Sequence, residues 1–216
     1  MRIPLTAHGI RELLLFGGGF LAISIALIPI APWASPVFFL LFLFVLSFFR
    51  DPDRSSDAGP DTAISPADGK VTDIEEVDEP YFLNGKALRI GIFLSVFNVH
   101  VNRAPIAGKV TGVRYLPGKF LDARDPQCII QNEANLVGFS GERGPFAVRQ
   151  ISGLIARKIV CPLAEGEELE RGRRMGMIKF GSRTELLVPV GADVEVLVKI
   201  GDKVLGGKTQ LLRYRS

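Results

Sequence analysis

A glycine–serine pair in the C-terminal part of the chain brings together two groups that can react with each other. Gly181 and Ser182 lie in RMGMIKFGSRTELLVP, between two apolar runs typical of strands. Glycine at such a place usually serves a bulge or tight turn. The pair also suits backbone cleavage, because the Gly181 carbonyl is unhindered and the Ser182 hydroxyl can attack it through a five-membered ring. The resulting ester could eliminate to dehydroalanine, which hydrolysis converts into a pyruvoyl group.

Such a reaction needs a base, and imidazole is scarce in this chain. The two histidines are His8, ahead of the apolar segments, and His100, in SVFNVHVNRAP, so His100 is the candidate base. A lone histidine among apolar neighbours is often a hydrogen-bonded core residue, and that interpretation stays open. Asp68, in the SPADGKV turn, is the candidate for orienting the imidazole, since a carboxylate on a rigid turn can stabilise its cationic form.

The composition argues against a protein-bound metal and against a nucleic-acid partner. Zinc sites usually need three or four His, Cys or carboxylate ligands, and this chain has 2 His and 2 Cys. Cys128 and Cys161 are predicted to be reduced packing residues. The 26 Lys and Arg nearly balance the 23 Asp and Glu, which gives no reason to expect nucleic-acid binding.

The N-terminal part is predicted to anchor the chain in a membrane. Hydrophobic residues make up 47% of the sequence, and two segments without charge, 13–30 and 33–49, are each about long enough to cross a bilayer. Prolines around their junction predict a tight turn, and therefore a helical hairpin over 1–50. A signal peptide would explain only the first segment. The pattern fits a hairpin that spans the membrane or one that re-enters the same leaflet.

Basic residues flank this hairpin, whereas its turn is uncharged. Arg2 and Arg11 precede the two apolar segments, and Arg50 and Arg54 follow them. The positive-inside rule therefore predicts that both ends lie in the cytoplasm. We expect a protein of the cell (inner) membrane whose catalytic domain lies on the cytoplasmic face.

The rest of the chain is predicted to be a mainly β domain of barrel-sandwich-like or mixed type, over 63–216, joined to the hairpin by a polar linker over 51–62. The GDKVLGG run at 201–207 resembles the turn and strand of a barrel-sandwich domain, without the lysine of a carrier turn. One helix, or an extension of a strand, is expected around 154–160. The expected strands are 70–77, 87–94, 109–115, 134–140, 146–152, 175–180, 194–199 and 209–214.

Four motifs, in order and spacing, resemble those of phosphatidylserine decarboxylase of the short bacterial and archaeal type. They are SPADG at 65–69, FNVHVNRAP ending at Pro105, QNEAN at 131–135 and KFGSR at 179–183. The resemblance covers the soluble domain and includes the preceding hairpin. It implies a self-processing, pyruvoyl-dependent carboxy-lyase that converts phosphatidylserine to phosphatidylethanolamine and CO2.

The resemblance also implies roles for three residues. Ser182 matches the nucleophile that becomes the pyruvoyl group, His100 matches its base, and Asp68 matches the residue that orients the base. Cleavage after Gly181 would give chains 1–181 and 182–216, which should stay associated through a shared sheet. A substrate amine would form a Schiff base with the pyruvoyl group, whose carbonyl accepts the electrons released as CO2 leaves.

Phe97 departs from the pattern, because longer members of the family have a histidine three residues before the one that matches His100. We expect His100 to act again as the proton donor in decarboxylation, with water or another group as alternatives. Candidate contacts for the substrate phosphate and headgroup are four cations and three polar residues. A single cation of this kind is more often a solvated surface residue, and the three polar residues fit a turn hydrogen-bonded to itself as well as a headgroup contact. They are Arg183, Arg149, Lys119, Arg103, Asn132, Glu133 and Asn135.

Two other classes of protein share these features. A non-catalytic, membrane-anchored barrel-sandwich adaptor would have the same strands and hairpin. A membrane-bound serine hydrolase would use Ser182, His100 and Asp68 without self-cleavage. The expected partners of the decarboxylase are a phospholipid substrate with ester or ether chains, the membrane, and the other cleaved chain; exposed strand edges would also permit a homodimer.

Overall fold

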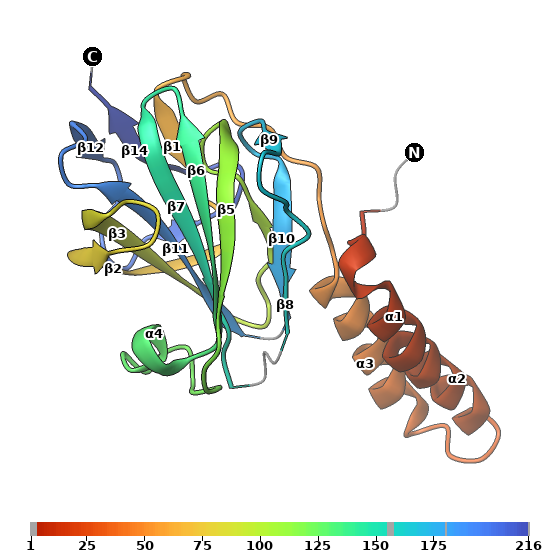
Figure 1. Ribbon diagram of the computed structural model, residues 1–216. Helices are drawn as coiled ribbons and strands as arrows, with labels where there is room; N and C mark the ends of the chain where they lie inside the picture. The colour runs from red at the N-terminus through yellow and green to blue at the C-terminus, as the bar shows by residue number, and fades with distance from the viewer. Residues whose placement is uncertain (1–3, 155–157, 180, 216) are drawn as a thin grey trace. The chain divides into compact units, whose positions relative to one another are not determined.

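The computed structural model describes residues 4–154, 158–179 and 181–215. The chain divides into two compact units, residues 1–53 and residues 54–216. The first unit is helical and the second is a β domain with one short helix, as Figure 1 shows. The two units are described separately below.

The first unit is a helical hairpin. Its first arm is continuous through η1 (Ala7–Gly9), α1 (Ile10–Glu12), the π turn η2 (Leu13–Gly17) and α2 (Gly18–Leu27), and α3 (Ser35–Phe48) forms the second arm. Near the turn, the Ser24 hydroxyl donates to the Ser35 carbonyl at 2.9 Å, and the Ser35 hydroxyl donates to the Ser24 carbonyl at 2.8 Å. At the open end, the Thr6 N–H donates to the Phe49 carbonyl at 2.9 Å. These hydrogen bonds pair polar groups with one another within the hairpin, as an apolar environment requires.

The apolar surface of this hairpin is suited to lipid. Within the described residues, Ala7–Leu27 is long and apolar enough to cross a bilayer, whereas α3 is shorter. Leu14 and Leu15 in the first arm and Leu40 in the second are each more than half exposed. The expected apolar hairpin is confirmed, while the choice between spanning and re-entry stays a prediction.

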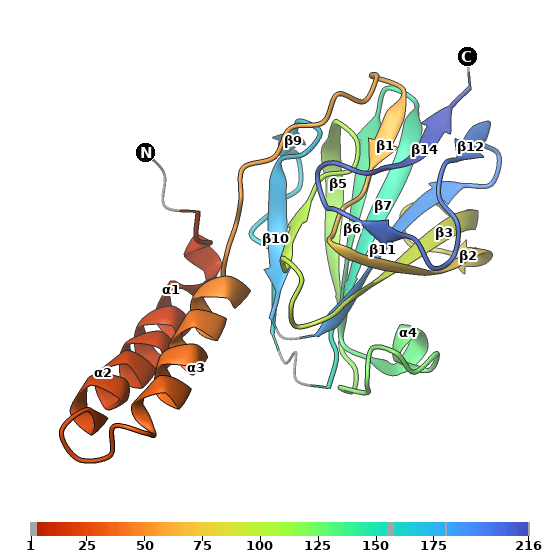
Figure 2. The same cartoon turned by 180° about the vertical axis from the view of Figure 1, so that it is seen from behind.

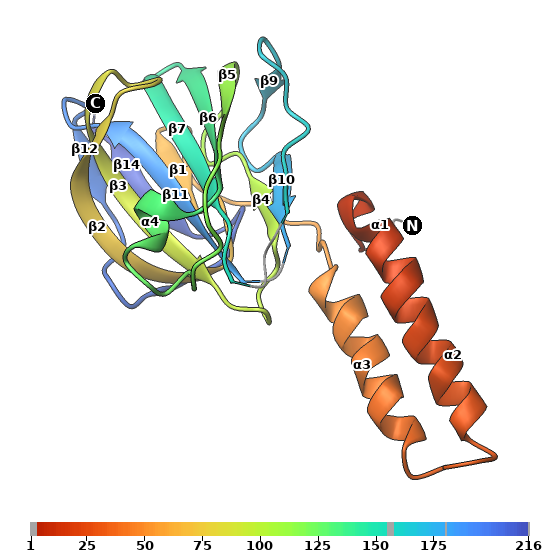
Figure 3. The ribbon, with the colours of Figure 1, turned by 60° about the horizontal axis from the view of Figure 1, so that its bottom comes forward.

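The second unit contains an eight-stranded antiparallel sheet among its described residues, in the order β13-β2-β3-β11-β7-β6-β5-β9 (Figures 1 and 2). Two three-stranded sheets, β1-β14-β12 and β4-β10-β8, complete the domain (Figure 3). The strands of the large sheet are β2 (Gly69–Glu79), β3 (Gly85–Leu94), β5 (Gly108–Leu116), β6 (Ala134–Gly141), β7 (Gly144–Ile151), β9 (Glu168–Leu169), β11 (Ser182–Pro189) and β13 (Lys203–Val204). The other elements are β1 (Thr62–Ile64), β4 (Val101–Arg103), α4 (Cys128–Gln131), β8 (Ile159–Val160), β10 (Arg174–Ile178), β12 (Val194–Val196) and β14 (Gln210–Tyr214).

Strand β11 occupies an interior position in the large sheet, between β3 and β7. Ser182 pairs with Leu94 of β3, and Arg183 pairs with Ile151 of β7. Both edges of β11 are hydrogen-bonded to neighbouring strands, and residues from Ser182 to Val188 are all buried. The register therefore fixes the start of β11 beside the ends of β3 and β7.

The two faces of β11 have different surroundings, because successive side chains of a strand point to opposite faces. Leu186 packs in the main hydrophobic core, whereas Leu187 packs in a smaller cluster on the other side. We call these the inner face and the outer face. By the same alternation, Ser182 belongs to the inner face and Arg183 to the outer face.

The mainly β fold predicted from the sequence is confirmed, and each expected strand overlaps an observed one. Of the two alternatives for 154–160, a helix or the extension of a strand, the structure has a strand at the end of this range, where Ile159 and Val160 form β8 and pair with Ile178 and Met177 of β10. Their β-branched side chains suit strand pairing. Residues 155–157 of the expected helix lie outside the described residues. The GDKVLGG run forms a turn and then β13, which pairs with the start of β2.

Candidate active site

Ser182, the first residue of β11, is fully buried. Its Oγ atom has no hydrogen-bond partner among the residues that the structure describes. Burying a hydroxyl without a partner costs about 1–3 kcal/mol. A natural protein that keeps such a group requires an explanation, and reactivity is one.

The peptide unit before Ser182 has an unusual conformation and tight packing. Gly181 has φ +65°, a left-handed conformation that costs residues with a side chain about 1–2 kcal/mol. A Cβ atom placed on Gly153 would lie 2.2 Å from the Gly181 carbonyl oxygen and 3.1 Å from its carbonyl carbon. The carbonyl that Ser182 would attack is therefore held against the backbone of Gly153.

His100 lies against the same peptide and is fully buried. Its Nδ1 lies 2.9 Å from the Asn98 carbonyl oxygen, and the Gly181 N–H donates to its Nε2 at 3.2 Å. A ring nitrogen that accepts a hydrogen bond carries no proton, so this pattern assigns the proton to Nδ1. The basic nitrogen of His100 thus faces the residue before Ser182, and the structure brings these two predicted site residues together.

Asp68 is buried in the turn before β2, where both carboxylate oxygens have partners. The Arg54 guanidinium pairs with both oxygens, with 2.9 Å between Nη2 and Oδ2, and the Gly206 N–H donates to Oδ1 at 2.8 Å. The turn lies beside β4, since the Arg103 N–H donates to the Pro66 carbonyl at 2.9 Å. In this uncut chain His100 Nδ1 faces the Asn98 carbonyl, so orientation of the imidazole by Asp68 stays a prediction.

Two of the predicted phosphate contacts, Arg183 and Arg149, belong to an ionic network on the outer face. Arg183 donates to Asp73 at 2.7 Å and to Glu185 at 2.8 Å. Burial opposes the charge of Arg183, but these carboxylates raise its pKa above the ordinary value. Burial likewise opposes the charge of Asp73, but Arg183 lowers the pKa of that carboxyl below its usual 3.8. Arg149 lies 3.9 Å from Glu185, so carboxylates accompany both arginines on the face away from the Ser182 side chain.

Lys119 lies in the segment 117–127, which contacts Gly153 through Ala123, and Asn132 is hydrogen-bonded to this segment. Asn132 is buried, and its Nδ2 donates to the Leu121 carbonyl at 2.9 Å and to the Ser152 carbonyl at 2.8 Å. It thus ties this segment to the end of β7. Lys119 is exposed, and its Nζ donates to the Gln131 side chain at 2.9 Å.

The other three predicted contacts take part in bonds of the surrounding framework. Glu133 accepts from the Tyr115 hydroxyl at 2.9 Å. Arg103 donates to the Gly172 carbonyl at 3.1 Å, and Asn135 hydrogen-bonds to the Cys161 side chain. Their contacts with a substrate stay predictions.

The sequence patterns did not single out a row of polar residues on the inner face. Gln150 donates to Asn102 at 2.8 Å, and Asn102 donates to Thr184 at 3.0 Å, with all three side chains fully buried. Ser152 follows on the same face of the chain after β7 and is also fully buried. The available signal was Gln150 and Ser152 alternating with apolar residues in a strand-like run.

Exposed apolar side chains follow, in the sequence, two residues that contact Gly181. Val96 Cγ1 lies 4.0 Å from the Cβ position of Gly181, and the next residue, Phe97, is 72% exposed. Leu154, which follows Gly153, is 59% exposed. We call Phe97 and Leu154 the apolar rim. Large exposed apolar residues mark a surface that an apolar ligand can approach.

The cysteines are free and show no sign of activation. Burial raises the pKa of the Cys128 thiol to about 11, and it also raises the pKa of Cys161. Both are therefore neutral thiols near pH 7. No group of three metal-ligating His, Cys, Asp or Glu side chains occurs within the described ranges.

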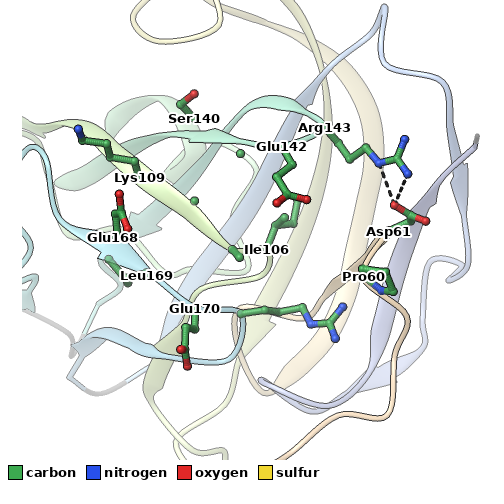
Figure 4. A pocket seen from close by; sticks show the side chains of 14 residues that line it. Pro60, Asp61, Ile106, Lys109, Ser140, Glu142, Arg143, Glu168, Leu169 and Glu170 are labelled. Atoms are coloured by element: carbon green, nitrogen blue, oxygen red, sulfur yellow. Dashed lines mark hydrogen bonds and ion pairs between the residues drawn. The ribbon is translucent and has the colours of Figure 1, made fainter.

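Two clefts lie away from the inner-face site. One, of about 760 Å³, is lined in part by the tip of the β6–β7 hairpin, where Arg143 pairs with Asp61 (Figure 4). This hairpin is at the opposite end of β7 from Ile151, the partner of Arg183, and therefore far along the sheet from Ser182. The other cleft, of about 520 Å³, includes Arg149 and Asn132 among its lining residues.

Fold and site together define a class: a β-domain protein with an apolar helical hairpin, in which a buried serine follows a left-handed glycine that contacts a buried histidine. Comparison with known proteins gives the family. The phosphatidylserine decarboxylase family model matches residues 41–211. The chain belongs to the phosphatidylserine decarboxylase family, as its four motifs predicted.

Similar proteins cover nearly the whole chain. The phosphatidylserine decarboxylase proenzyme of Symbiobacterium thermophilum is 45% identical over 99% of this chain and 97% of its own length. The proenzyme of Carboxydothermus hydrogenoformans is 47% identical over 85% and 86%, and that of Magnetococcus marinus is 42% identical over 93% and 94%. This kinship does not favour an adaptor or a serine hydrolase.

Proposed function

We propose that this chain is a phosphatidylserine decarboxylase that cuts its own backbone between Gly181 and Ser182 and works with the pyruvoyl group formed from Ser182. The observation that carries the proposal is the geometry of this one peptide. Its glycine is left-handed and contacts His100 Nε2, and its serine hydroxyl is buried without a partner in the described part of the chain. Family membership supports the substrate and the reaction.

Self-cleavage begins when His100 takes the proton of Ser182. Nε2 carries a lone pair beside this peptide and accepts a hydrogen bond from the Gly181 N–H. To take the proton, Nε2 must accept a hydrogen bond from the Ser182 hydroxyl instead. Such catalytic hydrogen bonds often tighten only as the reaction proceeds. The Asn98 carbonyl, 2.9 Å from Nδ1, then stabilises the imidazolium by accepting its Nδ1–H.

The residues around position 182 fit a pyruvoyl group after the cut. Strand β11 is paired along its length with β3 and β7, and β14 pairs with β1, so chain 182–216 stays held by strands of chain 1–181. When present, the group supplies a carbonyl that accepts the electrons released with CO2. His100 is buried beside the same position, and we assign it the second task of returning a proton to the product, since Phe97 replaces the additional histidine.

The surroundings of the site suit a lipid substrate. The two residues of the apolar rim directly follow Val96 and Gly153, which contact Gly181, and the hairpin provides an apolar anchor. Lys119 is exposed on the segment that adjoins Gly153, and we propose it as the contact for the substrate phosphate. From the arginines that flank the hairpin we place the catalytic domain on the cytoplasmic face of the cell membrane.

The proposal is tested with carboxyl-labelled phosphatidylserine in vesicles, by measuring labelled CO2 and the cut state of the full-length protein. Ser140 is an exposed serine on β6 and provides a matched control. Wild-type protein and Ser140→Ala should be cut and active, whereas Ser182→Ala should be uncut and inactive. Hydroxylamine should inactivate the cut enzyme by reacting with its ketone. Decarboxylation by an uncut chain, or by Ser182→Ala, would refute the proposal.

A further inference from the structure

Ser152 presents a second hydroxyl that folding leaves without a partner. Within the described ranges, three inner-face side-chain atoms are buried without a hydrogen bond: Gln150 Oε1, Ser152 Oγ and Ser182 Oγ. Leaving two hydroxyls and an amide oxygen buried without hydrogen bonds lowers the stability of the folded chain. The catalytic assignments above explain Ser182 and leave Ser152 unexplained.

The strand register sets Ser152 opposite Ser182. In the β7–β11 ladder, Thr184 pairs with Gln150 and Arg183 pairs with Ile151. Continuing the ladder by one residue brings Ser152 to the partner position of Ser182. Directly opposite residues on antiparallel strands point to the same face with Cβ atoms about 4.5–5.5 Å apart. The chain of hydrogen bonds from Gln150 through Asn102 to Thr184 shows that these side chains share the inner face.

The backbone at Ser152 is also held close to the scissile carbonyl. Gly153 packs onto the Gly181 carbonyl oxygen, with 2.2 Å between that oxygen and the Cβ position of Gly153. The Ser152 carbonyl is fixed by Asn132 at 2.8 Å, and the Ser152 N–H donates to the Glu133 carbonyl at 2.9 Å. The backbone of Ser152 is therefore held in place, while its hydroxyl remains available.

We propose that Ser152 is a catalytic hydrogen-bond donor for self-cleavage, stabilising the negative charge that develops on the Gly181 carbonyl oxygen. The inference rests on the proposed function. A hydroxyl beside the reacting carbonyl can turn its O–H toward the oxygen as charge appears, as donors of an oxyanion hole do. Its lack of a partner before the reaction leaves it free to make this bond.

The step balances as follows. Ser182 Oγ gives its proton to His100 Nε2 and bonds to the Gly181 carbonyl carbon, while the C=O π electrons move to the oxygen that accepts the Ser152 hydrogen bond. When this intermediate collapses, the C–N bond breaks and His100 returns the proton to the Ser182 nitrogen. The product is an ester between the Gly181 acyl group and Ser182 Oγ, with a free amine on residue 182.

The test compares Ser152→Thr with Ser152→Val, two side chains of nearly equal shape that differ in the hydroxyl. In the full-length protein, Ser152→Thr should cut itself at close to the wild-type rate and Ser152→Val about 10²–10³-fold more slowly, the usual effect of losing one such donor. Ser152→Ala should also cut slowly yet melt no lower than wild type, because no folded-state hydrogen bond is lost. A merely structural role would instead lower both cutting and melting temperature.

Equal cutting rates for folded Ser152→Thr and Ser152→Val would overturn the role of Ser152. If the wild-type chain itself stayed uncut, the proposed function would fail instead, so the two failures are distinguishable. Ser140→Ala should leave the cutting rate and the melting temperature unchanged.

Discussion

Replacing Gly153 by alanine should slow self-cleavage without touching any reacting side chain. The added Cβ would lie 2.2 Å from the Gly181 carbonyl oxygen, whereas close C···O contacts are about 3.3 Å. Either the carbonyl or the end of β7 must therefore move by about 1 Å. A misplacement of about 1 Å at a reacting group can cost about 10²-fold in rate, and overpacking typically costs about 1–3 kcal/mol of stability.

The assay follows the conversion of freshly purified full-length protein into its two chains by intact mass. Gly191→Ala is a matched control, because its Cβ would meet nothing within 4 Å, and it should cut like wild type. Thermal unfolding in detergent verifies that Gly153→Ala is folded. A folded Gly153→Ala chain that cuts at the wild-type rate would refute the view that the Gly181 carbonyl must stay where Gly153 allows it.

Three further predictions concern neighbouring groups. Gly181→Ala should cut more slowly and lose about 1–2 kcal/mol of stability, because φ +65° is strained for alanine; unchanged melting would contradict this. Asp68→Asn should cost about 3 kcal/mol in chemical unfolding, because the largely buried Arg54 loses its carboxylate; a loss below about 1 kcal/mol would show that water replaces it. The folded chain holds the pKa of Asp73 below 3.8, so the unfolded chain takes up the proton first and stability should fall as the pH drops below about 4; Asp73→Asn should flatten that fall, and an equally steep fall would contradict the assignment.

Residue types and strand patterns singled out residues that the structure brings together, and their reactivity stays a prediction. The rarity of histidine pointed to His100, and the Gly181–Ser182 pair stood out between two apolar runs. Alternating apolar residues and turn signals predicted the strands well, because both are local properties of the chain. The choice between a helix and a strand at 154–160 could not be made from the sequence, because a short run such as Ile159–Val160 takes its structure from its partner strand β10.

Contacts that depend on register or on backbone atoms could not be predicted. The Asn98 carbonyl that orients His100 has no side-chain signature, and neither does the packing of Gly153 on the Gly181 carbonyl. Arg54, which pairs with Asp68, lies in the polar segment 51–62 that was predicted to be a linker. Arg183 was predicted to contact the phosphate because it follows Ser182. Successive side chains of a strand point to opposite faces, so the Arg183 side chain lies on the outer face, where it donates to Asp73.

The mass of the small chain tests the central claim most directly. Purified wild-type protein is denatured, and the exact mass of the fragment that begins at residue 182 is compared with the mass calculated for 182–216. We predict a fragment lighter than the serine-initiated peptide by one ammonia and gaining one oxygen label when processing occurs in H2¹⁸O, as a pyruvoyl terminus requires. A fragment that starts with an intact serine amine, or a chain that remains whole while it decarboxylates phosphatidylserine, would contradict the account.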